Sequence, residues 1–119
     1  MRNQPKYSFF KNSSYALKGF LDIISSERSF QIELVLFVIL LPVLLFLPLG
    51  LLLKLSVFSS MMLVLIAEAT NSAIERTVDL VTKEYNELAG RAKDVGSTIV
   101  LLSIILSCVM WVVALVSVL

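Results

Sequence analysis

The sequence predicts an all-α integral-membrane protein with three transmembrane helices and a preceding amphipathic helix. Hydrophobic residues make up 58% of its 119 residues and charged residues only 16%, whereas ordinary soluble domains carry roughly 45–50% and about 25%. The apolar residues are gathered in long blocks. The first, 34–53, contains no charge and is long enough to cross a hydrocarbon core of about 30 Å. The whole chain, 1–119, is expected to form a single membrane domain.

Residues 8–25 are expected to form a helix that lies in the membrane surface. Their large apolar residues recur near helical spacing, while Lys11, Lys18 and Asp22 occupy other faces. An amphipathic helix directly before a membrane span is typical of an interfacial element.

Three membrane spans follow along the chain. The first is expected over 29–49, and the segment "LPLG", Leu47 to Gly50, supplies the break that ends it. The second is expected over 51–81, with a cytoplasmic extension at its charged end. The third is expected over 91–119 and carries almost all of its charge in its first few residues.

The cations predict the orientation of the chain. The first turn offers only Lys54 and the C-terminal tail offers none, so the other cations lie before the first span or between the second and third: Arg2, Lys6, Lys11, Lys18, Arg28, Arg76, Lys83, Arg91 and Lys93. Cytoplasmic loops carry the excess of lysine and arginine. The N-terminus and the second connection are therefore expected in the cytoplasm, and the C-terminus outside.

Composition also excludes several classes of function. A net charge of +1 gives no reason to expect nucleic acid. The single cysteine, Cys108, cannot form an intramolecular disulfide. Histidine is absent, so a general base would be a carboxylate, lysine, tyrosine or cysteine.

Four polar side chains of the second span fall on one helical face. At about 100° per residue, Asn71, Glu75 and Asp79 share an arc of about 80° with Glu68, whereas Arg76 points elsewhere. Glu68 lies about 26 Å along the helix from its start, which places it near the cytoplasmic edge of the hydrocarbon. A polar stripe at this depth usually faces a bundle interior or a wet cavity. Three short helices offer little interior, which favours an oligomer.

Two interpretations stay open for Glu68. It could simply mark where the helix leaves the membrane, or it could serve as a partly buried general base. Glu75, nearer to water, could hold Mg²⁺, which prefers carboxylate oxygens together with phosphates and water. Glu27 could complete such a site if its segment packs against the second span.

The segment "NELAGRAKDVGS" leads into the third span. Gly90 is expected as the break before that helix, so that its first turn carries Arg91, Lys93 and Asp94. Cations at a helix N-terminus run against the dipole preference, which indicates bound phosphate, although flanking positive charge is the plain alternative. The sequence has no P-loop motif, and a stacking surface for a base could come from aromatic residues near this edge: Phe10, Tyr15 and Tyr85.

Two longer segments carry a family resemblance. "AEATNSAIERTVDLVTKEYNELAGRAKDVGSTIV", 67–100, closely resembles the signature of the small bacterial membrane diacylglycerol kinases, and "SERSFQIE", 26–33, looks like the segment before their first span. The resemblance implies a homotrimeric inner-membrane lipid kinase that uses ATP and Mg²⁺. It implies phosphorylation of the primary hydroxyl of diacylglycerol to phosphatidic acid.

The resemblance also implies roles for individual residues. Glu68 resembles the catalytic base, with Asn71 beside the reaction centre, and Glu27 and Glu75 resemble metal-binding acids. Nucleotide binding is expected from those two acids together with Tyr15, Lys93 and Asp94. Lipid binding is expected at Glu68 and Ser97, and supporting roles at Glu33, Asp79, Glu84, Glu87 and Arg91. The chain departs from the family pattern at Ser8 and Asn86, so no contact is carried over there.

Three alternatives are weighed against this function. The nearest is the same chemistry on undecaprenol, whose kinases are related. A small multidrug-type transporter also uses a membrane glutamate, but it needs four spans. The third alternative is a membrane subunit without enzymatic activity.

Overall fold

The computed structural model describes residue 3 and residues 6–119, so Arg2, one of the cations counted above, lies outside the described residues. Four helices follow one another: α1 (Phe9–Ser26), α2 (Arg28–Phe46), α3 (Leu51–Val81) and α4 (Glu87–Ser117). The last three are long and apolar enough to cross a membrane. The described part of the chain contains no strand. These findings confirm the predicted fold class.

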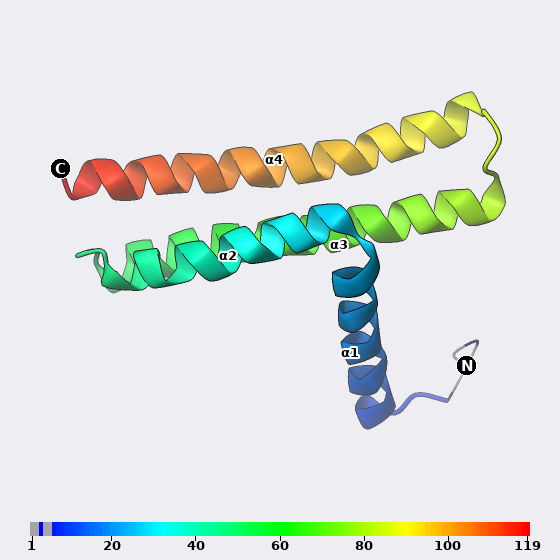
Figure 1. The fold of residues 1–119 in the computed structure, drawn as a ribbon, viewed down its shortest axis with the longest axis horizontal. Helices are drawn as coiled ribbons and strands as arrows, with labels where there is room; N and C mark the ends of the chain where they lie inside the picture. The colour runs from blue at the N-terminus through cyan, green and yellow to red at the C-terminus, as the bar shows by residue number, and fades with distance from the viewer. Residues whose placement is uncertain (1–2, 4–5) are drawn as a thin grey trace.

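The three spans lie side by side, and α1 projects away from them, crosswise to their axes (Figure 1). Helix α3 packs against both α2 and α4 and holds most of the buried residues. The core forms where the three helices meet, from Leu44, Val57, Met61 and Ala114. Within the α3–α4 contact, Ser60 Oγ donates to Ser107 Oγ at 3.2 Å, a polar link of the kind that joins helices in lipid.

Local sequence explains where the helices begin and end. Ser8 caps α1, since its side chain accepts from the Lys11 N–H. Helix α2 continues through Pro42 and ends at Phe46, and its C-terminal cap is Leu47, the start of the predicted "LPLG" break. There Lys54 Nζ donates to the Leu45 carbonyl at 2.7 Å, which satisfies one of the carbonyls that a helix end leaves unpaired.

The prediction of a break at Gly90 is wrong. Helix α4 already begins at Glu87, and Gly90 lies inside it. Asn86 provides the cap, because its Oδ1 accepts from the Ala89 N–H at 3.0 Å, and asparagine is among the preferred capping residues. Arg91 therefore lies in the second turn rather than the first, and the free N–H groups of the helix end lie one turn before it.

Candidate active site

Glu68 is buried, with 7% of its surface exposed, on the face of α3 that looks toward the start of α2. The carboxylates of Glu33, Glu75 and Glu27 lie within electrostatic range of it. Four predicted site residues are thus gathered at one end of the bundle, although they come from α2, from α3 and from the α1–α2 junction. Like charges this close repel unless a proton or a cation offsets them.

Asn71 and Glu75 form a pair within α3. Asn71 Nδ2 donates to Glu75 Oε1 at 3.2 Å, as residues four apart on a helix do. Asn71 Oδ1 is buried and has no hydrogen-bond partner among the described residues. It lies against Gly96 of α4, where an added Cβ would meet Oδ1 directly. Gly96 therefore allows the close approach that shields the Asn71 amide.

Glu27 is held by Arg76, a residue that sequence reasoning placed away from the site. Glu27 is both the C-terminal cap of α1 and the N-terminal cap of α2. Arg76 Nε and Nη2 donate to Glu27 Oε1 at 3.2 and 3.0 Å. The α1–α2 junction therefore packs against α3, which was the condition for Glu27 to join Glu75. No local sequence pattern indicates this contact, because 49 residues separate the two partners.

The described residues contain no group of three or more His, Cys, Asp or Glu side chains that could hold a metal ion by themselves. Glu27 and Glu75 each engage only Oε1 in the hydrogen bonds described above. Two carboxylates with free oxygens fit Mg²⁺, which usually takes one or two protein carboxylates and fills its other positions with phosphates and water. The donor set is thus suited to a magnesium–phosphate complex.

Lys93 is paired with Asp79. Its Nζ lies 2.7 Å from Asp79 Oδ1 and joins α4 to α3, and Glu75 lies within electrostatic range of the same ammonium group. Both partners are about two-fifths exposed, so Lys93 remains open to solvent on one side.

A polar cavity of about 390 Å³ adjoins this pair at the α3–α4 connection. Four further residues named above line it: Glu84, Glu87, Arg91 and Asp94. Its lining also includes Tyr85 and the capping residue Asn86. Lys93, which lines this cavity, connects it to the acids through its electrostatic interaction with Glu75.

The remaining predicted residues are less enclosed. Tyr15 is half-buried in the middle of α1. Ser97 is exposed on α4, directly after Gly96. Ser8 acts as the α1 cap, which gives this departure from the family pattern a structural role.

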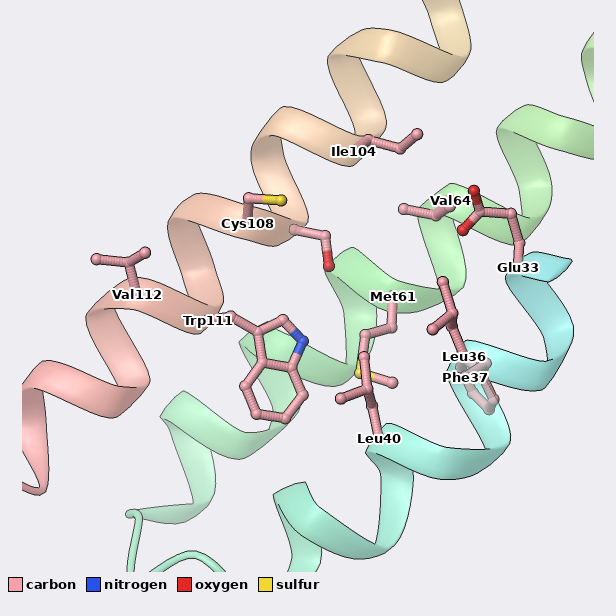
Figure 2. A pocket seen from close by; sticks show the side chains of 11 residues that line it. Glu33, Leu36, Phe37, Leu40, Met61, Val64, Ile104, Cys108, Trp111 and Val112 are labelled. Carbon is pink, nitrogen blue, oxygen red and sulfur yellow. The ribbon is translucent and has the colours of Figure 1, made fainter.

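An apolar groove of about 390 Å³ lies between α2 and α4, with α3 as its floor (Figure 2). Helix α2 contributes Glu33, Leu36, Phe37 and Leu40, and α4 contributes Ile104, Ser107, Cys108, Trp111 and Val112. The Trp111 ring stands between α4 and α2 (Figure 2). Its Nε1 is buried and has no hydrogen-bond partner among the described residues, so the groove wall carries an unused donor.

The groove leads to the acids. Its floor is Met61 and Val64, which share the Glu68 face of α3 because residues three, four and seven apart align on a helix. Glu33 lines the groove itself and lies near Glu68. A sequence pattern could show the shared face of α3, but not the gap between α2 and α4. Fold and site together define a membrane enzyme whose buried carboxylate stands between an apolar groove and a polar end.

Comparisons with known proteins specify the family. The profile of the prokaryotic diacylglycerol kinase family matches residues 14–115. Diacylglycerol kinase of Escherichia coli (strain K12) is 38% identical over 88% of this chain and 86% of its own length. The Haemophilus influenzae diacylglycerol kinase is 35% identical over 84% and 85%. Undecaprenol kinase of Bacillus subtilis is 32% identical over 85% and 82%. The chain belongs to the prokaryotic diacylglycerol kinase family.

Proposed function

We propose that the protein transfers the γ-phosphoryl group of ATP to the primary hydroxyl of diacylglycerol and so produces phosphatidic acid and ADP. The observation that carries this proposal is the apolar groove that runs along the Glu68 face of α3 toward a buried carboxylate. A groove lined by apolar side chains suits an acyl chain, and it directs the polar head of a lipid toward Glu68. The Trp111 N–H offers a donor for an ester carbonyl of that lipid.

In this mechanism Glu68 accepts the proton of the lipid hydroxyl while the hydroxyl oxygen attacks the γ-phosphorus and ADP leaves. Its burial favours the role, because a base in a water-poor site is poised for proton transfer. Asn71, fixed by Gly96 and bonded to Glu75, orients the reacting groups. Phosphoryl transfer depends mainly on such positioning and on electrostatic stabilisation.

The nucleotide is proposed to bind at the polar end of the bundle. Glu27 and Glu75 would hold Mg²⁺, which offsets the charge that develops on the phosphate oxygens. Lys93 and Asp94, beside the polar cavity, would contact the nucleotide from α4, and Tyr15 would approach it from α1. Ser97 would contact the lipid head group. Among the supporting residues, Glu84, Glu87 and Arg91 line the cavity. Glu33 lies near Glu68, and Asp79 is paired with Lys93.

The surroundings of the subunit are part of the proposal. Helices α2 and α4 leave most of their apolar surface exposed, which supports a homotrimer with further contacts along these faces. The cation distribution supports insertion in the bacterial inner membrane with the N-terminus and the α3–α4 connection in the cytoplasm. ATP would then reach the site from the side on which it is made.

Undecaprenol is the second candidate substrate, because one relative in Bacillus subtilis is an undecaprenol kinase. A transporter or a non-enzymatic subunit finds no support in the family. The test is transfer of radiolabelled γ-phosphate in lipid nanodiscs that contain either diacylglycerol or undecaprenol. We expect faster transfer to diacylglycerol, and a result in which undecaprenol is preferred would reverse the substrate assignment.

A variant assigns the base. Glu68→Gln keeps the size of the side chain but cannot accept the proton, so we expect a loss of about 10²–10⁴ in kcat. Thr70→Val is the matched control, because Thr70 is exposed on the same helix and bonds only to the Ile66 carbonyl of its own turn. Wild-type turnover in the Glu68 variant would refute the base assignment.

A further inference from the structure

Helix α1 is attached to the bundle by few contacts. None of its residues is buried, and it projects away from the three spans (Figure 1). Its contacts with α2 include an edge-to-face pair, in which the rings of Phe20 and Phe30 lie 5.9 Å apart, and a hydrogen bond of 2.6 Å that Gln31 Nε2 donates to the Ile24 carbonyl. With so little buried surface, the orientation of α1 depends on the polar contacts at its C-terminal end.

Arg76 makes most of these polar contacts, and it makes them from α3. Its Nη1 lies 2.8 Å from Asp22 Oδ2, and its Nη2 donates to Ser26 Oγ and Glu27 Oε1, each at 3.0 Å. All three acceptors lie in the last two turns of α1 or at its cap. A planar guanidinium can engage several acceptors at fixed angles, which a lysine ammonium cannot.

The contact with Glu27 is selective for one oxygen. Both bonds from Arg76, from Nε and from Nη2, end on Oε1, so Arg76 leaves Oε2 available to another partner. Arg76 also follows directly after Glu75, and adjacent helical residues project about 100° apart. One turn of α3 thus presents Glu75 on the Glu68 face and, through Arg76, holds Glu27. Both carboxylates lie within electrostatic range of Glu68.

We propose that Arg76 is a positioning residue, which holds the α1–α2 junction so that Glu27 presents its free oxygen to the magnesium–nucleotide complex. This inference rests on the proposed function and deepens its nucleotide site. The side chains of Arg76 and Asp22 are about half exposed, and exposed ion pairs add little to stability. The role of Arg76 is therefore geometric: it orients a ligand group and a surface helix.

Two measurements on the full-length protein in nanodiscs test the inference. Hydrogen–deuterium exchange, measured in the absence of nucleotide, reports how firmly α1 is held against the bundle. Steady-state kinetics report the KM for Mg-ATP and the KM for lipid separately. Arg76→Ala removes all three contacts. Arg76→Lys keeps the positive charge but loses the planar guanidinium that engages several acceptors. Arg28→Ala is the matched control, because Arg28 is exposed next to Glu27 and takes part in none of the described ion pairs.

In Arg76→Ala we expect the amides of the last two turns of α1 to exchange about fivefold faster or more. We expect the KM for Mg-ATP to rise about fivefold, with the KM for lipid within about twofold of wild type. Arg76→Lys should be intermediate in both measurements, and Arg28→Ala should match wild type. Should Arg76→Ala fail to fold, Asp22→Asn, which weakens a single contact, supplies the same test with changes of about twofold.

Different results overturn different claims. Unchanged exchange of α1 in Arg76→Ala would overturn the inference, because α1 would then be held by other contacts. A loss confined to kcat, with both KM values unchanged, would overturn it too, since this is the pattern of a smaller fraction of folded protein. A wild-type protein that phosphorylates no lipid would overturn the proposed function, whatever the exchange of α1 shows.

Discussion

Gly96 of α4 and Asn71 of α3 lie so close together that no side chain fits between them. A Cβ on Gly96 would meet Asn71 Oδ1, and it would also lie 3.4 Å from Asn71 Cγ and 3.5 Å from Ile74 Cδ1. Small residues allow membrane helices to approach in this way. Here the approach occurs at a residue that bonds directly to Glu75, so helix packing and site geometry depend on the same contact.

Gly96→Ala is expected to push Asn71 away from Glu75. Overpacking of this kind costs about 1–3 kcal/mol, and we expect both a lower thermal unfolding midpoint in detergent and a lower kcat. Gly19→Ala is the control, because Gly19 lies in α1 with nothing within 4 Å of its Cβ position. That change should stabilise its helix by up to about 1 kcal/mol. Equal behaviour of the two alanine variants would show that α4 can shift without cost.

At the Lys93–Asp79 pair, we expect substitutions to change nucleotide binding without a large change in the free energy of unfolding. Because the pair is exposed, loss of either partner should change the free energy of unfolding by no more than about 1 kcal/mol. Lys93→Met should nevertheless raise the KM for ATP about tenfold if its ammonium contacts phosphate. Asp79→Asn, which leaves the ammonium in place, should change that KM by less than about twofold. Similar KM values for both variants would mean that Lys93 only joins the two helices.

The Asp22–Arg76 contact predicts a stabilisation that is constant near neutral pH and is lost only at acid pH. The hydrogen bond and the charge of Arg76 hold the pKa of the Asp22 carboxyl below its ordinary value. The stabilisation is therefore complete above the unfolded pKa of about 3.9 and is lost as the pH falls through the lower folded pKa. The melting temperatures of wild type and Asp22→Asn should differ by a constant amount from pH 5 upward and converge below about pH 3.9. Convergence between pH 6 and 8 would contradict this assignment.

The apolar groove predicts a change in acyl-chain preference. Ile104 lines the groove (Figure 2), and Ile104→Phe should reduce the space for a long acyl chain. We expect the KM for long-chain diacylglycerol to rise about fivefold and that for a short-chain analogue by less than about twofold. Ile105→Phe is the matched control, since Ile105 is 49% exposed and does not line the groove. An equal effect on both chain lengths would place the acyl chain elsewhere.

The fold was predictable because each span contains a long apolar block and because Leu47 to Gly50 separate the first two spans. The start of α4 was not predictable in the same way. Gly90 is the stronger break by composition, but the cap formed by Asn86 and the open space around Gly90 let the helix continue through it. Local propensity is a weak guide where a good cap lies one turn earlier.

The site was predictable only in part. Helical periodicity placed Glu68, Asn71 and Glu75 on one face, because these residues share one helix and its fixed geometry. Contacts between helices carry no such local signal. The angle of Arg76 on α3 places it off the Glu68 face, and its partners lie 49 to 54 residues earlier in the chain. The groove depends on the spacing of α2 and α4, which no single-segment pattern contains.

Helix α2 is much the shortest of the three spans. Its 19 residues extend about 28 Å, whereas the 31 residues of α4 extend about 46 Å. The hydrocarbon of a typical bilayer is about 30 Å thick, so α2 has no length to spare and cannot tilt without drawing its ends inward. Hydrophobic mismatch at α2 would be transmitted directly to Glu27 and Glu33 at its first turns. The thickness of the host membrane thereby becomes a variable of catalysis, one that the lipids of the cell set rather than the protein.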